Sequence, residues 1–491
     1  MVDFDAEGRM LIDGKLTDAA SGATFANVNP ATEEVIGQVA DGGAADMDRA
    51  IGAARRAFDE TDWSTNRVLR RRCLQQFKDA LEREKETLRP QVVAEVGTPI
   101  ILTYAIQLDS CIVDLQWDID LIDAYEWEQD LPVYEFMGQR SGRRVYKEPI
   151  GVVGAITPWN FPLMLNLSKL GPALAAGNTV VLKPAPDTPW SATFIGRLAA
   201  EQTDLPPGVL NIVTAGDKAE VGEVLTGDPR VDMISFTGSS ATGKRIMARG
   251  ADSLKKVFLE LGGKSANIVL DDADFASVVP AGSMTCMHAG QGCAITTRML
   301  LPASRYDEGV ELLRTAFAEF PYGDPTDPAN LMGPLINARQ RDRVLGYIEK
   351  GKAEGGRLLV GGGVPERFPK GFFVEPTLFV DVDPDATIAQ EEIFGPVLVV
   401  LRYEDDGDAV RIANNSRYGL SGAVNSASLE RALAVASQIR TGTIAVNGGQ
   451  WFGTDSPFGG YKESGIGREH GLAGFEEYLE FKTVGLPADA A

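Results

Sequence analysis

The residue in this sequence best suited to covalent chemistry is Cys293, which lies among small and β-branched residues in the stretch 290–298. A cysteine thiolate is a strong nucleophile, but a free thiol has a pKa of about 8.5 and needs activation near neutral pH. Catalysis at Cys293 therefore requires a base, a donor for a developing oxyanion and an acceptor for electrons. Cys73 and Cys111 lie on apolar stripes of expected helices, and Cys286 lies in the segment before Cys293, so we expect these three to be packed.

Two further side chains could assist that thiol. Glu260 precedes a Gly-Gly pair, where a carboxylate on an exposed, mobile turn could reach a thiol and a water molecule as a general base. Asn160 lies between Pro158 and Pro162, and its amide, like the backbone N–H of Cys293, could donate to an oxyanion. Each residue alone also fits a structural role, Glu260 as a surface residue and Asn160 as a turn residue.

The stretch 236–244 has the pattern of a phosphate-binding turn. A strand is followed by small and hydroxyl residues and then by a helix, whose first N–H groups can bind phosphate. The stretch is not G-x-G-x-x-G, so an ordinary strand-to-helix turn is the alternative. Lys183 ends an earlier strand, where it could bind a ribose hydroxyl or simply be a surface lysine.

The composition limits the classes of partner. The chain has 491 residues and a net charge of -22, which argues against nucleic acid or an anionic membrane. Its four cysteines show no C-x-x-C spacing and fit a reducing compartment. With only His288 and His470, we expect no metal site. No signal peptide or bilayer-spanning run is visible, so we expect a cytoplasmic location.

Hydrophobic periodicity predicts helices first and then alternating strands and helices. The early elements are expected as helices at 44–60, 66–85 and 101–126 and a protruding hairpin at 130–147. Strands are then expected at 151–156, 179–183, 209–213 and 233–236, with helices at 163–176, 189–202, 217–226 and 240–250. Thr188 should cap the second of these helices, with Pro189 at its first position. Later elements are expected as a helix at 338–354 and strands at 376–381, 397–402 and 476–486.

Taken together, these motifs resemble the NAD(P)-dependent aldehyde dehydrogenase superfamily over essentially the whole chain. The matching stretches are 157–162, 183–184, 236–243, 260–264, 290–298, 391–396 and 456–462. The resemblance implies an α/β fold with a Rossmann-like parallel-sheet cofactor domain at 1–127 and 149–259. It also implies an α/β catalytic domain at 260–463 and a small β oligomerisation element at 128–148 and 464–491, hence a homodimer or homotetramer.

The same resemblance implies a role for each matched residue. Cys293 would attack an aldehyde, Asn160 would hold the oxyanion with the Cys293 N–H, and Glu260 would activate the water that hydrolyses a thioester. The nicotinamide would accept the hydride, and Lys169 would be a nearby polar support. The implied cofactor-binding residues are Ile156, Thr157, Pro158, Trp159, Lys183, Gly216, Phe236, Thr237, Gly238, Ser239, Leu261, Gly262, Glu392 and Phe394.

The cofactor region departs from the family pattern at one position. Many NAD-preferring members carry a glutamate three residues after the lysine matched by Lys183, and this sequence has Pro186 there. Proline neither accepts hydrogen bonds from ribose hydroxyls nor repels a 2′-phosphate. We therefore expect NAD as cofactor with NADP also compatible, and favour NAD because this stretch contains no arginine to pair with the phosphate.

The expected substrate pocket is apolar. The resemblance implies that it is lined by Phe161, Leu165, Ser168, Gly292, Ala294, Trp451, Phe452 and Phe458. Ser168, Gly292 and Ala294 leave room for a large hydrophobic aldehyde, whether aromatic, terpenoid or medium-chain. Because the set contains no arginine, a semialdehyde with a carboxylate is a less favoured alternative.

Three other functions were weighed against aldehyde oxidation. A CoA-acylating relative usually lacks the carboxylate matched by Glu260. A catalytically silent homologue would not need Cys293, Glu260 and Asn160 together. A cysteine hydrolase without cofactor would not need the strand-helix array or its hydroxyl-rich turn.

Overall fold

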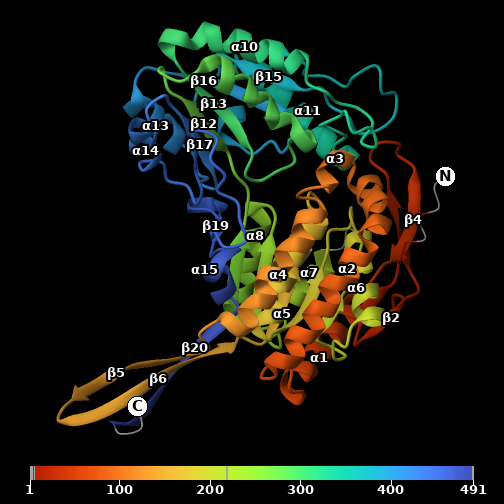
Figure 1. The fold of residues 1–491 in the computed structure, drawn as a ribbon. Coiled ribbons are helices and arrows are strands. Elements are labelled where there is room, and N and C mark those ends of the chain that lie inside the picture. Colours follow the sequence, from red (N-terminus) through yellow and green to blue (C-terminus); the bar gives the residue numbers. More distant parts are fainter. Residues whose placement is uncertain (1–3, 5, 217–218, 489–491) are drawn as a thin grey trace.

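The computed structural model describes residues 4, 6–216 and 219–488. Two α/β bodies lie one above the other, and a long hairpin projects from the lower body (Figure 1). Each body is built around its own sheet, in agreement with the α/β class expected from the alternating elements. Within the described residues, no helix is both long and apolar enough to cross a membrane.

The larger sheet has eight strands within the described residues, in the order β19-β11-β10-β7-β8-β9-β1-β2. Its central strands run parallel, with β1, β2 and β19 antiparallel at the edges. The parallel strands are β7 (Val152–Ile156), β8 (Thr179–Lys183), β9 (Leu210–Ile212), β10 (Met233–Thr237) and β11 (Lys256–Glu260). The edge strands are β1 (Met10–Ile12), β2 (Lys15–Thr17) and β19 (Gly465–Ile466).

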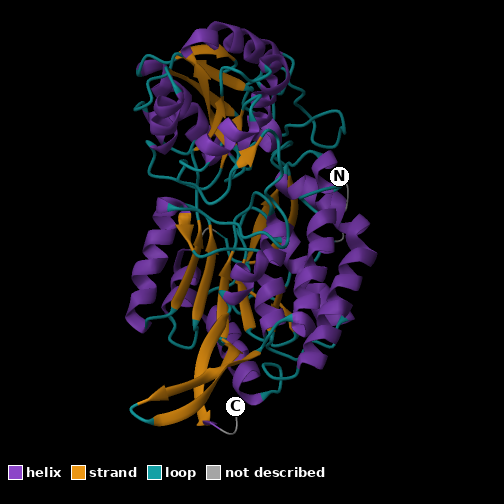
Figure 2. Ribbon diagram, turned by 60° about the vertical axis from the view of Figure 1, so that its left-hand side comes forward, coloured by secondary structure: helices purple, strands orange, loops and turns teal. Residues whose placement is uncertain are grey.

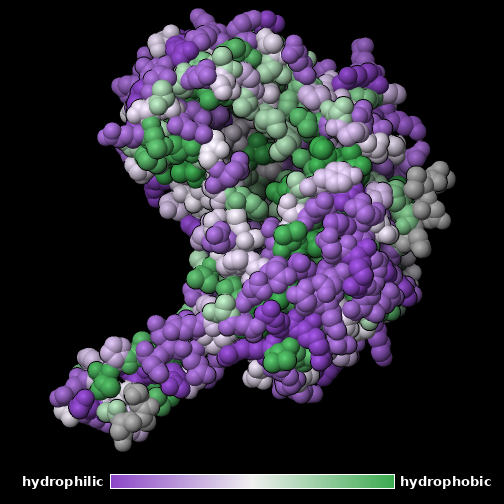
Figure 3. All heavy atoms as spheres, in the orientation of Figure 1, coloured by the Kyte–Doolittle hydropathy of each residue, from purple (hydrophilic) through white to green (hydrophobic). Residues whose placement is uncertain are grey.

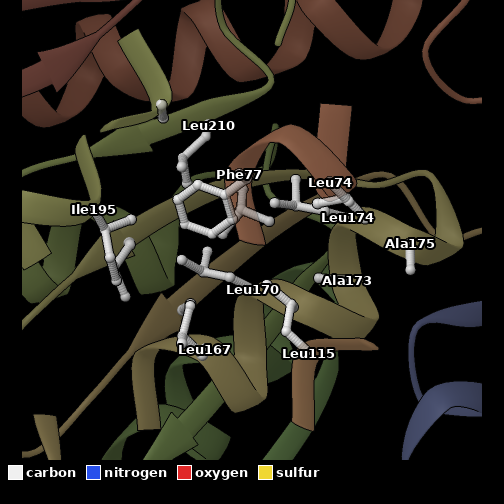
Figure 4. Packing of buried hydrophobic residues seen from close by; sticks show 14 of the residues in the cluster. Leu74, Phe77, Leu115, Leu167, Leu170, Ala173, Leu174, Ala175, Ile195 and Leu210 are labelled. Atoms are coloured by element: carbon white, nitrogen blue, oxygen red, sulfur yellow. The ribbon is translucent and has the colours of Figure 1, made fainter. Parts of the chain in front are cut away.

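Helices cover both faces of this sheet, as its continuous apolar strands require. One face carries α2 (Arg67–Val96), α4 (Asp109–Ala124), α5 (Pro162–Ala176) and α6 (Trp190–Gln202). Figure 4 shows side chains of these four helices packed together with Leu210 of β9. The other face carries α1 (Ala44–Glu60), α7 (Ala219–Gly227) and α8 (Ser240–Gly250). Positions 217 and 218, where the third helix of the alternating region was expected to begin, lie outside the described residues.

Two helix predictions in this body were wrong in detail. The helix expected at 101–126 is two helices, α3 (Ile100–Thr103) and α4, and α2 continues well past its expected end at 85. The start of α6 also differs, because Pro189 is itself the N-cap and Thr188 makes no capping bond. The buried Glu95 carboxylate from α2 instead accepts the N–H groups of Trp190 and Ser191, each at 2.9 Å. A long-range carboxylate thus replaces the expected local cap.

The second sheet has seven strands within the described residues, in the order β14-β15-β16-β13-β12-β17-β18. They are β12 (Ser265–Val269), β13 (Thr296–Pro302), β14 (Arg357–Val360), β15 (Thr377–Val380), β16 (Val397–Tyr403), β17 (Gly422–Asn425) and β18 (Ala445–Val446). Its larger helices are α10 (Tyr306–Ala318), α11 (Ala338–Ala353), α13 (Asp406–Asn414) and α14 (Leu429–Ala436). Buried side chains between these helices and strands form a separate core.

The projecting hairpin consists of β5 (Glu128–Phe136) and β6 (Gln139–Pro149), and β20 (Leu479–Pro487) pairs antiparallel with β6. Apolar side chains on this element are exposed, including Phe136, Met137 and Phe481. The segment after 463 contributes to two sheets, because β19 joins the large sheet and β20 joins the hairpin. The remaining elements are β3 (Thr24–Val28), β4 (Val35–Ala40), α9 (Phe275–Val278), α12 (Thr387–Gln390) and α15 (Gly471–Glu476).

Candidate functional site

The predicted site residues come together between the two bodies. Loops and turns fill this region (Figure 2), and the space-filling view shows a hollow there with largely hydrophobic visible walls (Figure 3). Ile156, Lys183, Thr237 and Glu260 end four neighbouring parallel strands. The carboxyl ends of such strands are where α/β sheets bind ligands.

Cys293 lies between a 3-10 segment, η2 (Pro280–Gly290), and β13, and it is the only partly exposed cysteine among the four, all within the described residues. The backbone just before it turns through positive φ at His288, Ala289 and Gly290, with values of 54°, 56° and 70°. Burial, and then the charge of the nearby Glu260 carboxylate, raises the pKa of the Cys293 thiol well above its usual range. The thiol therefore has to give its proton to a base before it can attack.

Glu260 differs from the exposed, mobile carboxylate that the sequence suggested. It is 1% exposed and lies at the end of β11, which pairs with β10 on one side and β19 on the other. Neither carboxylate oxygen has a hydrogen-bond partner among the described residues. Burial, with a contribution from the charge of Glu469, raises the pKa of Glu260 well above its usual range. A carboxyl group with a raised pKa and free oxygens is suited to proton transfer near neutral pH.

A buried ion pair lies near this carboxylate. The Lys169 ammonium is 2.6 Å from a Glu469 carboxylate oxygen and donates to the Ser235 hydroxyl at 3.2 Å. The charge of Lys169 opposes the upward shift in the pKa of Glu260. Sequence reasoning missed Glu469, because an isolated glutamate between Arg468 and His470 has no distinguishing pattern in a single sequence.

Asn160 lies in the loop between β7 and α5, and it is held by its side chain and by its main chain. Its amide nitrogen donates to the main-chain oxygen of Gln291 at 2.9 Å, and its own main-chain oxygen lies 2.8 Å from His288 Nε2. Gln291 and His288 both belong to the segment before the nucleophile. The ring of His288 therefore contacts the Asn160 loop and forms no Cys-His pair with Cys293.

The expected cofactor residues lie on two sides of the hollow. Ile156, Lys183 and Gly216 line a cavity of about 230 Å³ together with Pro186. The turn at Phe236, Thr237 and Gly238 leads into α8, where the Ser239 hydroxyl caps the helix by accepting the N–H of Thr242 at 3.3 Å. Gly238 N–H also donates to the Glu260 main-chain oxygen at 3.0 Å, which ties this turn to the buried carboxylate.

The opposite side of the hollow carries the residues expected near the nicotinamide. Glu392 accepts the N–H of Gly263 at 3.0 Å, and a Cβ added at Gly262 would lie 2.3 Å from the same carboxylate. Trp159 and Phe394 contact each other edge to face at 5.4 Å. The glycine at 262 thus leaves the space that this glutamate occupies.

The cofactor cavity also contains residues that the sequence analysis missed, among them an arginine. Arg245 of α8 lines the cavity and pairs with Glu223 of α7, outside the stretch around Lys183 that contains no arginine. The packing of α7 against α8 brings Glu223 and Arg245 together. No local pattern around Lys183 indicates that Arg245 lies there. The chain therefore offers one guanidinium group at the cavity, already paired with a carboxylate.

Aromatic rings form much of the expected substrate side. Trp451 stacks on Phe458 with ring centres 5.5 Å apart, and Phe452 contacts His470 at 5.3 Å. Phe161 packs on His288 at 5.1 Å. These ring contacts are observed, and the assignment of the residues to the walls of a substrate pocket stays a prediction.

The substrate side also contains acidic groups that the sequence analysis missed. Ser168 lines a narrow cavity together with Asp114 and Asp118 of α4. Burial raises the pKa of both carboxyl groups, more strongly for Asp118. Their i, i+4 spacing, which places them on one helix face, was the available signal. The raised pKa values favour the neutral form of both groups, so they repel a ligand carboxylate only after they ionise at higher pH.

Comparisons with known proteins agree with this geometry. The family model described as the aldehyde dehydrogenase family matches residues 16–484. A 3-succinoylsemialdehyde-pyridine dehydrogenase from a Pseudomonas species is 42% identical over 477 residues, which is 96% of this chain and 97% of the relative.

Two solved structures are similar over nearly their full length. One is a variant of aldehyde dehydrogenase C from Pseudomonas syringae in complex with NAD+ and octanal, with a TM-score of 0.92, 41% identity and coverage of 99% of this chain and 98% of that one. The other is a Mycobacterium tuberculosis aldehyde dehydrogenase in complex with NAD+, with a TM-score of 0.93, 43% identity and coverage of 98% of each chain.

Proposed function

This chain belongs to the aldehyde dehydrogenase family, and from that premise we propose that it oxidises an aldehyde to a carboxylic acid with NAD+. The observation that carries the proposal is the meeting of three groups. These are the partly exposed Cys293 thiol, the buried Glu260 carboxyl group that interacts with this thiol, and the Asn160 amide, which is hydrogen-bonded to Gln291 two residues before Cys293. Together they provide a nucleophile, a base and an oxyanion donor.

The residues around the cavity at the strand ends fit a dinucleotide. Lys183 and the N-terminus of α8 offer positive charge and N–H groups, and glycines at 216 and 238 allow close approach. Glu392, held by Gly263 N–H, would bind a ribose. When bound, NAD+ supplies the hydride acceptor. Structures of two related enzymes hold NAD+, and Pro186 leaves NADP compatible with this chain.

The protein's own groups would then act in two stages. Glu260 takes the thiol proton of Cys293, and the thiolate bonds to the carbonyl carbon while Asn160 and the Cys293 N–H hold the oxygen. After oxidation the carbon remains on sulfur as a thioester. Glu260 releases its first proton to solvent and then takes a proton from water, which attacks the thioester; the acid leaves, and Glu260 returns this second proton to the Cys293 thiolate. Lys169 and Glu469 act on this base through their charges.

We propose a bulky hydrophobic aldehyde as substrate. The stacked rings of Trp451 and Phe458 support this choice, and a relative of known structure binds octanal. The name of one related enzyme contains a semialdehyde, which makes a semialdehyde the alternative substrate class. The comparison to make is kcat/KM for octanal and benzaldehyde against succinic semialdehyde, and a clear preference for the semialdehyde would refute the hydrophobic assignment.

The overall reaction is tested by following absorbance at 340 nm with NAD+ and then NADP+, with and without CoA. Wild type should oxidise aldehyde without CoA, and Cys293→Ala should be inactive. Full activity of Cys293→Ala would exclude the thioester mechanism. A strict requirement for CoA would identify an acylating enzyme, and no activity on any aldehyde would identify a silent homologue.

We further propose the domain division and assembly implied by the sequence. The cofactor domain would comprise 1–127 and 149–259, the catalytic domain 260–463, and the oligomerisation element 128–148 and 464–491. The exposed apolar side chains of the hairpin and the outer edge of β20 support a homodimer or homotetramer in the cytoplasm. Light scattering of the purified protein tests the assembly, and a monomer at all concentrations would contradict it.

A further inference from the structure

His288 lies five residues before the nucleophile, yet its ring contacts the loop that carries Asn160. Its Nε2 atom is 2.8 Å from the main-chain oxygen of Asn160, and the residue is 1% exposed. A carbonyl oxygen only accepts hydrogen bonds, so at this distance the proton lies on Nε2. Burial lowers the pKa of His288 to about 4, which keeps the ring neutral at physiological pH. His288 is therefore a neutral donor to Asn160.

The main-chain oxygen of Asn160 has a second donor. Gln107 Nε2, from the segment between α3 and α4, donates to the same oxygen at 2.9 Å. This oxygen comes just before α5, whose N-cap residue Phe161 makes no side-chain capping bond. The peptide group is thus held by two side chains from different parts of the chain.

The side chain of Asn160 is anchored from another direction. Its Nδ2 atom donates to the main-chain oxygen of Gln291 at 2.9 Å. An amide nitrogen carries two N–H groups, so one N–H remains for a ligand. With the peptide group and one N–H both fixed, the direction of the second N–H depends on these anchors.

The backbone around His288 indicates that its position is strongly determined. His288 and Ala289 both adopt left-handed backbone angles, which are unfavourable for a residue with a Cβ. Such angles persist where the surrounding contacts enforce them, commonly near functional sites. Here the main-chain N–H of His288 donates to the main-chain oxygen of Leu331. The main-chain oxygen of His288 accepts from both the main-chain N–H and the side-chain Nε2 of Gln291. The turn thereby places His288 and Gln291 on two sides of Asn160.

We propose that His288 is a positioning residue for aldehyde oxidation, which holds the Asn160 peptide so that the free N–H of the Asn160 amide meets the developing oxyanion. The inference rests on the proposed function, because it takes Asn160 as the oxyanion donor. His288 itself contacts neither the thiol nor the carboxylate base among its hydrogen bonds. Its contribution is to the geometry of a donor.

The test compares two substitutions of the same residue. His288→Phe keeps a ring against Phe161 but removes the donor, and His288→Gln retains an N–H group. We expect His288→Phe to lower kcat/KM for octanal about tenfold, because a misplaced oxyanion donor loses part of the effect of a deleted one. His288→Gln should retain most of the wild-type kcat/KM. NAD+ affinity and the alkylation rate of Cys293 by iodoacetamide, which forms no oxyanion, should stay unchanged. Equal losses in alkylation and oxidation would overturn the proposal.

A double-mutant cycle separates this proposal from the proposed function. Asn160→Ala should lower kcat/KM by about 10²–10³, and adding His288→Phe should cause no further loss, because both changes act through one donor. A further tenfold loss in the Asn160→Ala background would refute positioning through Asn160. An active Asn160→Ala enzyme would instead refute the oxyanion assignment. If His288→Phe does not fold, Gln107→Leu removes the other donor to the same oxygen and enters the same cycle with the same two outcomes.

Discussion

Replacing the buried base gives the sharpest test of the two-stage mechanism. Glu260→Gln keeps the shape of the side chain, which in the wild type is buried and interacts with the Cys293 thiol. The variant cannot take a proton from water, and general-base catalysis contributes about 10²–10⁴ in rate, or roughly 3–5.5 kcal/mol of barrier. We expect steady-state turnover to fall by that factor and the thioester on Cys293 to accumulate.

The assay combines NADH absorbance with intact mass. In Glu260→Gln, acid quenching during turnover should reveal protein that carries one acyl group per chain. The double variant Glu260→Gln with Cys293→Ala should carry no acyl group. If another group takes the thiol proton of Cys293, the variant should still show a rapid burst of NADH before the slow phase. If Glu260 takes that proton as well, the burst itself should be slower than in wild type. Steady-state turnover within about threefold of wild type would refute the assignment of Glu260 as the base for water.

The same substitution has a defined effect on stability. Because the folded-state pKa of Glu260 is raised, its contribution to stability is full below its unfolded pKa and is lost as pH rises through the folded value. Glu260→Gln removes that loss, so the variant should melt at a higher temperature than wild type at neutral and alkaline pH. Cys293→Ala, which leaves the buried carboxylate in place, is the matched control and should keep the wild-type pH dependence.

Three further outcomes are expected. Burial raises the pKa of Glu95 to about 7, so wild type should lose up to about 3 kcal/mol of stability as pH rises from 4.5 through 7, and Glu95→Gln should flatten this slope in urea titrations; equal slopes would contradict it. Lys169→Met leaves Glu469 buried and unpaired, which should cost about 3–5 kcal/mol, and Lys169→Met combined with Glu469→Gln should recover most of it; no recovery would refute the pairing. Because burial raises the pKa of Asp118, its carboxyl group becomes charged only as pH rises, so kcat/KM for succinic semialdehyde relative to octanal should fall with rising pH, and Asp118→Asn should remove this fall; the same pH dependence in the variant would exclude Asp118 from substrate selection.

Local patterns were sufficient for much of the fold. The continuous apolar strands β7, β8 and β10 and the helices between them follow from short-range periodicity, and α1 has the bounds that its spacing predicted. The errors lie where distant residues decide. Glu95 replaces a local cap at α6, and the break between α3 and α4 occurs within an unbroken apolar pattern.

The sequence by itself determined the family resemblance, the order of strands and helices, and the choice of Cys293 as the candidate nucleophile, because each depends on residues close together along the chain. The tertiary structure alone decided the environment of those groups. Glu260 became a buried carboxyl group, Lys169 met Glu469 at a separation of 300 residues, and His288 met Asn160 at a separation of 128. Desolvation and hydrogen-bond partners are set by whatever the fold packs around a side chain, and a local pattern does not specify those neighbours.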